Sequence, residues 1–204
     1  MSIFKKKEIM VPKHVGILID KVISAKNIEE LIYCATQLKI PVLTIGLPQE
    51  SGDVLGGLIQ AIGNWQYIVE HQIKISVLGK WYALSEQIVQ QIKVVVEKTK
   101  EYDGFFLNLC VNYDGQAEIV SACKLLAKQV QSGKLDPDAI DELLVKENVF
   151  TSNFMPPEVI IITGAEHCLH NFLLWDSGKS KIVFTGKPAE KLSVKEFERF
   201  VTNI

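Results

Sequence analysis

The chain has 204 residues, of which 48% are hydrophobic, and its formal net charge is −2 at pH 7. This length and composition fit one globular domain with a sizeable core and exclude a disordered chain. The slight negative charge argues against nucleic-acid binding, and no apolar run is long enough to span a membrane, so we expect a cytoplasmic protein.

Residues 1–13 are predicted to form a loose basic lead-in, and residues 14–204 are predicted to form a single domain. The lead-in contains Lys5, Lys6 and Lys7, but no apolar core follows them, so it does not resemble a secretion signal. A run of three lysines is usually a solvated tail and would adhere only weakly to an anionic membrane surface.

Short apolar runs alternate with amphipathic stretches along the rest of the chain. The apolar runs predict strands at residues 14–19, 41–47, 73–79, 104–111, 159–162 and 181–184. The amphipathic stretches predict helices at residues 27–38, 54–72, 85–100, 116–131, 137–146 and 193–202. This alternation indicates an α/β domain with a mostly parallel six-stranded sheet and helices on both faces.

Two of the predicted helices begin with a capping signal. Asn27 is a good N-cap residue with Glu30 three positions later, and Ser193 is followed in the same way by Glu196. These signals place the starts of the first and last helices.

The most informative stretch runs from Pro157 to Trp175. Its β-branched run predicts a strand buried on both faces, and Thr163-Gly164-Ala165 ends that strand. In open parallel sheets, ligands bind at the carboxyl ends of the strands. Polar residues follow there, before the chain becomes apolar again: they are Glu166, His167, His170 and Asn171.

This stretch resembles the late signature block of the cis-prenyltransferases, the undecaprenyl diphosphate synthase family. In that block a buried strand leads into Arg-Thr-Ser/Gly-Gly-Glu-x-Arg-x-Ser-Asn-Phe-Leu-Leu-Trp. The matching residues are Thr163, Gly164, Glu166, Asn171, Phe172, Leu173, Leu174 and Trp175. Residues 12–20, 107–120 and 135–141 also resemble family blocks, in the right order. The resemblance implies a six-stranded parallel sheet surrounded by helices, an apolar tunnel for a growing polyprenyl chain, and paired subunits.

The positions that bind diphosphate or Mg²⁺ in the family depart from its pattern. Asp20 matches the metal-binding Asp, but the Gly-Asn-Gly-Arg loop that follows it in the family is absent. Ile162 and Cys168 stand where two arginines grip a diphosphate, and Lys181 stands at or near a metal-binding Glu. Residues 49–53 lack the Asn and Trp of the family's mobile loop. The resemblance therefore implies that most of the positive charge of the site has been lost.

Each polar candidate also has a structural interpretation. Asp20 is either a capping or solvated carboxylate or, in an active enzyme, a metal ligand. Glu166 and His167 either brace the turn or act with Asp20 in catalysis. Asn112 and Tyr113 either shape a turn or, together with Gly164, line a substrate pocket.

The end of the signature block has two interpretations as well. Asn171 is expected to bond a backbone group of a neighbouring strand or subunit. The apolar run that follows is expected to form core or a subunit interface: it comprises Phe172, Leu173, Leu174 and Trp175.

We expect a non-catalytic accessory subunit of a heteromeric cis-prenyltransferase, which makes polyprenyl diphosphate from isopentenyl diphosphate and an allylic primer. Such heteromers are known in the family. The chain would need no cofactor of its own, since Mg²⁺ would bind the catalytic partner; a homodimer is the alternative assembly. Contact with a membrane surface or a polyprenyl lipid is a further option. The alternative functions are a divergent, active Mg²⁺-dependent enzyme and an isoprenoid-lipid-binding protein without chemistry.

Overall fold

All the predicted strands are found in one sheet of the computed structural model, which describes residues 11–21, 23–48 and 52–202. The strands are β1 (His14–Leu18), β2 (Val42–Gly46), β3 (Ile73–Leu78), β4 (Phe105–Cys110), β5 (Val159–Ile162) and β6 (Lys181–Phe184). They lie in the order β3-β4-β2-β1-β5-β6, and every neighbouring pair is parallel. The α/β fold is therefore confirmed, and its described sheet is parallel throughout.

The helices follow the predicted order, with several changes in their bounds. They are α1 (Ala25–Gln37), α2 (Gly52–Asn64), α3 (Gln66–Glu70), α4 (Glu86–Thr99), α5 (Gly115–Gln131), α6 (Glu142–Asn148) and α7 (Val194–Thr202). Short 3₁₀ turns are η1 (Trp81–Ala83), η2 (Pro137–Ala139), η3 (Asp176–Lys179) and η4 (Ala189–Lys191). In the part of the chain that the structure describes, no helix is long and apolar enough to cross a membrane. Lys5, Lys6, Lys7 and residues 49–51 lie outside the described residues.

One of the two predicted helix caps is wrong. The first helix begins at Ala25, and its N-cap is Ser24, whose hydroxyl accepts a hydrogen bond from the Asn27 N–H. Serine caps helices as well as asparagine does, so the two residues between Ser24 and Asn27 simply extend the helix. The capping box at the last helix is confirmed, because the Glu196 N–H donates to Ser193 Oγ and the Ser193 N–H donates to Glu196 Oε2.

Two stretches that were each predicted as one helix are divided. Residues 54–72 form most of α2 and all of α3, because Trp65 between them has an extended backbone and its ring stacks on Tyr67 with a centroid distance of 4.6 Å. Residues 137–146 form η2 and the start of α6. There Asp141 is extended and accepts a hydrogen bond from the Leu144 N–H, so it caps a new helix.

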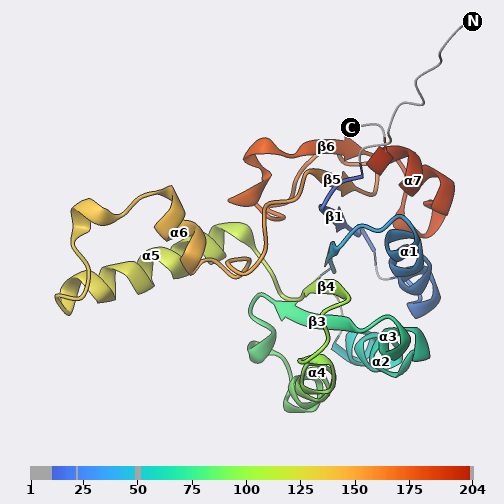
Figure 1. The fold of residues 1–204 in the computed structure, drawn as a ribbon, viewed down its shortest axis with the longest axis horizontal. Coiled ribbons are helices and arrows are strands. Elements are labelled where there is room, and N and C mark those ends of the chain that lie inside the picture. The colour runs from blue at the N-terminus through green and yellow to red at the C-terminus, as the bar shows by residue number, and fades with distance from the viewer. Residues whose placement is uncertain (1–10, 22, 49–51, 203–204) are drawn as a thin grey trace, which may run out of the picture.

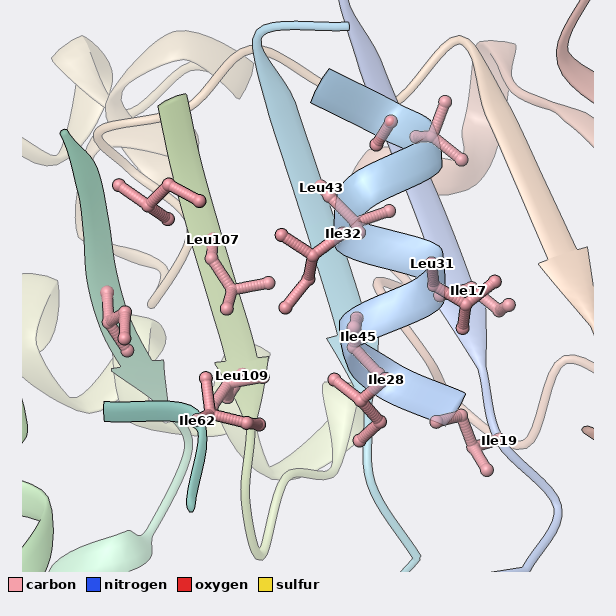
Figure 2. Close-up of a cluster of buried hydrophobic side chains, with 14 of the residues drawn as sticks. Ile17, Ile19, Ile28, Leu31, Ile32, Leu43, Ile45, Ile62, Leu107 and Leu109 are labelled. Atoms are coloured by element: carbon pink, nitrogen blue, oxygen red, sulfur yellow. The ribbon is translucent and has the colours of Figure 1, made fainter. Parts of the chain in front are cut away.

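The larger core lies on one face of the sheet, beneath α1, α2, α4 and α7. Figure 2 shows α1 lying across the sheet, with Ile28, Leu31 and Ile32 directed toward apolar strand residues. These three side chains are at most 5% exposed. The space between α1 and the sheet is therefore occupied by branched aliphatic side chains.

The opposite face has a smaller core. Ile160 and Ile162 pack there with Phe172 and Leu173 from the segment after β5. The Phe172 ring lies so close to β2 that a Cβ at Gly46 would come within 2.7 Å of it. Among the described residues, α1, α2, α4 and α7 all contribute to the larger core only, so the prediction of helices on both faces is only partly right.

The helices α5 and α6 extend away from the sheet and form an arm, which we define as residues 115–148 (Figure 1). The two helices pack on each other. Several large apolar side chains of the arm remain exposed: Val120, Leu125, Ile140 and Leu143. Exposed apolar side chains of this size on one element are candidates for contact with another molecule.

The buried His14 joins three strands through hydrogen bonds. Its Nδ1 lies 2.5 Å from the Met155 carbonyl, which can only accept, so Nδ1 carries the proton. Nε2 then accepts from the Thr44 hydroxyl at 2.7 Å, and Thr44 Oγ1 accepts from the Asn108 amide at 3.0 Å. Burial lowers the pKa of His14 below its ordinary value of 6.5.

We expect the free energy of unfolding to fall as the pH drops below 6.5, because the unfolded chain then binds a proton that the buried His14 does not. Above that pH the imidazole of His14 is neutral in both the folded and the unfolded chain. Its contribution to the free energy of unfolding is then fully present. Urea unfolding at about pH 7.5 and about pH 5.5 measures the decline. His14→Gln should make the decline smaller, whereas the matched variant of exposed His71, His71→Gln, should not. An equal decline in both variants would contradict this role.

Candidate functional site

A cavity of about 520 Å³ opens at the carboxyl ends of the central strands. Its walls come from the segments that follow β1, β2, β4 and β5, as the rule for parallel sheets predicts. The lining residues are Leu18, Ile19, Asp20, Lys21, Leu47, Pro48, Tyr113, Thr163, Gly164, Ala165, Glu166 and His170. Because the ends of four parallel strands converge on it, this cavity is the candidate site.

Asp20 braces one wall of the cavity. Its Oδ1 accepts a hydrogen bond from the Ala189 N–H at 2.9 Å and lies 2.8 Å from the Thr163 hydroxyl. Its own N–H donates to Thr163 Oγ1. Among the described residues, nothing donates a hydrogen bond to Asp20 Oδ2. The carboxylate therefore fits the capping interpretation, at η4 rather than at α1, and one oxygen remains for solvent or a ligand.

The structure separates Glu166 and His170 from His167. The carboxylate of Glu166 lies 3.2 Å from Nε2 of His170, and both side chains line the cavity while remaining largely exposed. His167 lies outside the lining and stacks on Phe184, with a centroid distance of 5.0 Å. Within the described ranges, no three His, Cys, Asp or Glu side chains are placed to hold a metal ion. The predicted trio of Asp20, Glu166 and His167 is therefore not brought together.

Tyr113 and Gly164 line the cavity as predicted for a substrate pocket, but Asn112 does not. Asn112 has a left-handed backbone, with φ of 46°, and its amide donates to the Lys80 carbonyl at 3.2 Å. The Lys80 N–H in turn donates to the Asn112 carbonyl. Asn112 therefore shapes the turn after β4, which is the structural role that the sequence left open.

The Tyr113 hydroxyl is committed to a buried partner that the sequence analysis missed. It donates to Glu118 Oε2 at 2.5 Å, and the Phe150 N–H donates to Glu118 Oε1 at 2.8 Å. Burial raises the pKa of both Tyr113 and Glu118. The sequence did contain a signal that Glu118 is buried, because it lies at helical spacing from Ala122 and Leu126 on the buried stripe of α5.

Gly164 allows the turn after β5 to pass close to Asp20. Its φ is +95°, and a Cβ there would come within 2.9 Å of the Asp20 Cβ. Its N–H donates to the Lys187 carbonyl at 2.7 Å. This amide is therefore used inside the protein and does not serve as a donor to an anion in the cavity.

Gly164→Ala should lower the free energy of unfolding by about 1–3 kcal/mol, because it combines a left-handed backbone with a contact against Asp20. Urea unfolding measures the loss. Gly133→Ala is the matched control, since Gly133 also has a positive φ of 70° but nothing within 4 Å of its Cβ position. An equal loss in both variants would show that the contact with Asp20 has no effect.

The end of the signature block mainly builds the chain's own structure. The Asn171 amide donates to Asp114 Oδ2 at 3.0 Å, a side chain rather than the predicted backbone group, and the Asn171 carbonyl accepts from the Gly115 N–H. Phe172 and Leu173 are each 1% exposed, so they form core, the first of the two predicted roles. Leu174 and Trp175 are half-buried, and their place in a subunit interface stays a prediction.

The residues that replace the family's charged groups do not restore a cationic site. Ile162 is buried at the end of β5, and Cys168 is exposed outside the cavity lining. Lys181 pairs with Val159 at the amino-terminal end of β5, opposite to the end at which the cavity opens. It therefore does not line the cavity, although its expected alignment with a metal-binding Glu implied that it would.

Among the described residues that line the cavity, there is one lysine and no arginine. The lysine is Lys21, whereas Lys26 is exposed outside the lining. The whole chain has a single arginine, Arg199. It lies on α7 with its guanidinium carbon 5.1 Å from the centroid of the Phe200 ring. No residue of α1 or of the described side chains of α2 lines the cavity either, so its apolar wall comes from the strand ends.

The sequence of this chain is similar to that of known prenyl diphosphate synthases. A family described as "Putative undecaprenyl diphosphate synthase" matches residues 22–203. The tritrans,polycis-undecaprenyl-diphosphate synthase (geranylgeranyl-diphosphate specific) of Methanocaldococcus jannaschii is 30% identical over 203 residues, which cover 85% of this chain and 72% of that protein. The isoprenyl transferase of Streptococcus thermophilus is 31% identical over 206 residues, which cover 86% of this chain and 82% of that protein.

Solved structures share the fold. Lavandulyl diphosphate synthase from Lavandula x intermedia, solved with dimethylallyl diphosphate, has a TM-score of 0.86 at 24% identity, with 94% of both chains covered. A probable undecaprenyl diphosphate synthase from Campylobacter jejuni has a TM-score of 0.75 at 22% identity, with 92% of both chains covered.

Proposed function

We propose that this chain, which belongs to the undecaprenyl diphosphate synthase family, is a non-catalytic subunit that assists a catalytic sister chain. The single observation that carries the proposal is the charge of the cavity. In the described part of the chain, its lining has two carboxylates, on Asp20 and Glu166, and one ammonium group, on Lys21. A diphosphate carries several negative charges and needs cations or aligned donors to replace its hydration. The described lining offers too few of them.

Two hydrogen-bond donors around the cavity are also committed to the protein itself. The Gly164 N–H is bound to the Lys187 carbonyl, and the Tyr113 hydroxyl is bound to Glu118. His170 has Glu166 as its neighbour. The Gly164 N–H and the Tyr113 hydroxyl are therefore not available to a diphosphate, in addition to the missing arginines.

Magnesium would find a poor site in this chain. Oδ1 of Asp20 is occupied by two donors, and Oδ2 would be the one carboxylate oxygen of Asp20 left for a metal. Mg²⁺ is usually held by one or two carboxylates together with substrate phosphates, which this cavity does not retain. We therefore assign Mg²⁺ to the proposed catalytic partner.

The arm supports an accessory role because it offers a surface for a partner. Its exposed apolar side chains include Val120 and Leu143, at 51% and 65% exposure. The root of the arm is tied to the cavity wall, since Glu118 holds both Tyr113 and Phe150. A partner that binds the arm would therefore contact an element whose root also shapes the cavity.

A divergent active enzyme is the second candidate. It is favoured by one observation, the free Oδ2 of Asp20 in the cavity wall next to Lys21. This candidate predicts that Asp20 holds Mg²⁺ while Lys21 contacts the diphosphate.

Turnover separates the two functions. The chain should form no prenyl product from labelled isopentenyl diphosphate, an allylic primer and Mg²⁺, because its cavity lacks a diphosphate grip. Adding it to a sister synthase with complete motifs from the same source should raise that enzyme's turnover or lengthen its product. Product from the chain alone that is lost in Asp20→Asn would overturn the accessory role and support the active enzyme.

A further inference from the structure

A second hollow, of about 700 Å³, lies between η1 and α4. Its apolar wall comes from Trp81, Ile92, Val94 and Val96. Val94 is 65% exposed, and Tyr82, which follows Trp81 on η1, is 62% exposed. In Figure 1, α4 lies well apart from the arm, so this is a separate surface. We call Trp81, Tyr82, Val94 and the walls of the hollow the η1–α4 patch.

The aromatic residues of the η1–α4 patch form a unit at the surface. The rings of Trp81 and Tyr82 meet edge to face, with centroids 6.3 Å apart. Trp81 is half-buried and packs against the larger core, whereas Tyr82 and Val94 project into solvent. Trp81 therefore anchors the neighbouring Tyr82, which no described residue covers.

The charge around the patch is positive although the chain as a whole has a net charge of −2. Lys93 and Lys98 line the hollow. The one carboxylate in the lining, Glu97, forms an ion pair with Lys100 at 2.6 Å. The Lys98 ammonium donates to the Gly63 carbonyl.

We propose that the η1–α4 patch docks the chain on an anionic membrane surface. Tryptophan and tyrosine favour the boundary between lipid head groups and tails, because their rings are amphipathic. Val94 would enter the acyl region beside them, and the lysines would face lipid phosphates. The proposal uses residues outside the cavity and the arm, so it stands or fails independently of the proposed function.

The chemistry favours a membrane over a protein partner. Each lysine near an anionic surface strengthens binding about fivefold, and the attraction extends only about 8–10 Å in physiological salt. Two lysines with a small apolar anchor therefore predict weak, reversible and salt-sensitive adhesion. That is the behaviour of a peripheral protein rather than of a permanent complex.

Co-sedimentation of the full chain with lipid vesicles tests the proposal. Binding should be strong to vesicles of phosphatidylcholine with about one third phosphatidylglycerol, and weak to phosphatidylcholine alone. Val94→Asp should reduce binding about tenfold or more, because it removes the apolar anchor and adds a repelled charge. Leu143→Asp is the matched control, since Leu143 on the arm has the same 65% exposure, and it should bind as the unchanged chain does.

Two further variants exclude other sources of binding. Replacing Lys5, Lys6 and Lys7 together with glutamine should leave most of the binding intact. Brominated lipids should quench tryptophan fluorescence in the unchanged chain and much less in Trp81→Phe. Circular dichroism should show that each variant is folded. The proposal is overturned if the chain does not bind anionic vesicles, or if Val94→Asp and Leu143→Asp bind them equally. It is also overturned if the substitutions of Lys5, Lys6 and Lys7 alone abolish binding.

Discussion

Lys146→Met should lower the free energy of unfolding by about 3–5 kcal/mol, because it leaves a buried carboxylate without its cation. The Lys146 ammonium lies 2.8 Å from Oδ1 of Asp176 and donates to Oδ2 at 2.9 Å. It also donates to the carbonyl and the hydroxyl of Thr151. The two ionised side chains are only 16% and 2% exposed, so water cannot replace the lost contacts.

The loss should come from the unpaired charge rather than from the absence of the pair. The double variant Lys146→Met with Asp176→Leu should therefore recover much of the stability lost in the single variant. Lys100→Met is the control for a lysine in an exposed ion pair, with Glu97, and should leave the urea midpoint unchanged. If Lys146→Met unfolds at the same urea concentration as the unchanged chain, the buried pair does not stabilise this fold.

The parallel sheet could be predicted from the sequence because each strand is a short run of apolar residues. The run from Val159 to Ile162 is a clear case, since all four residues are fully buried between two cores. Helix boundaries were harder to predict. Trp65 divides a continuous apolar pattern through its own backbone conformation and a ring contact, which periodicity alone does not show.

The cavity wall could be predicted where the residues directly follow a strand. Asp20, Tyr113 and Gly164 were named as candidates on the family resemblance, and they meet in the cavity because parallel strands bring their carboxyl ends to one edge of the sheet. Hydrogen-bond partners were not predictable, since Asp20 bonds the N–H of Ala189 across a large separation in sequence. Asp176 was missed for the same reason, because its partners Lys146 and Thr151 come from another segment.

The two exposed apolar surfaces allow a crossed experiment. Leu143 on the arm and Val94 on the η1–α4 patch are both 65% exposed. Aspartate at either position should leave the fold intact, because neither side chain belongs to a core. Each variant therefore removes one surface and serves as the control for the other.

Leu143→Asp should weaken the association of this chain with its catalytic sister by about 30-fold or more, the size expected for a residue that contributes about 2 kcal/mol to an interface. The cause is a charge buried against an apolar partner surface without a counter-ion. Isothermal titration of the two purified chains measures the affinity, and stimulation of sister turnover should be lost at the same concentrations.

Val94→Asp should associate with the sister chain as the unchanged protein does, while losing its binding to anionic vesicles. If instead Val94→Asp abolishes stimulation and Leu143→Asp preserves it, the η1–α4 patch is the partner surface and the arm is not. If both variants stimulate the sister fully, neither surface carries the association. Because the two side chains are equally exposed, an unequal result reports the location of the partner rather than a general effect of adding a charge.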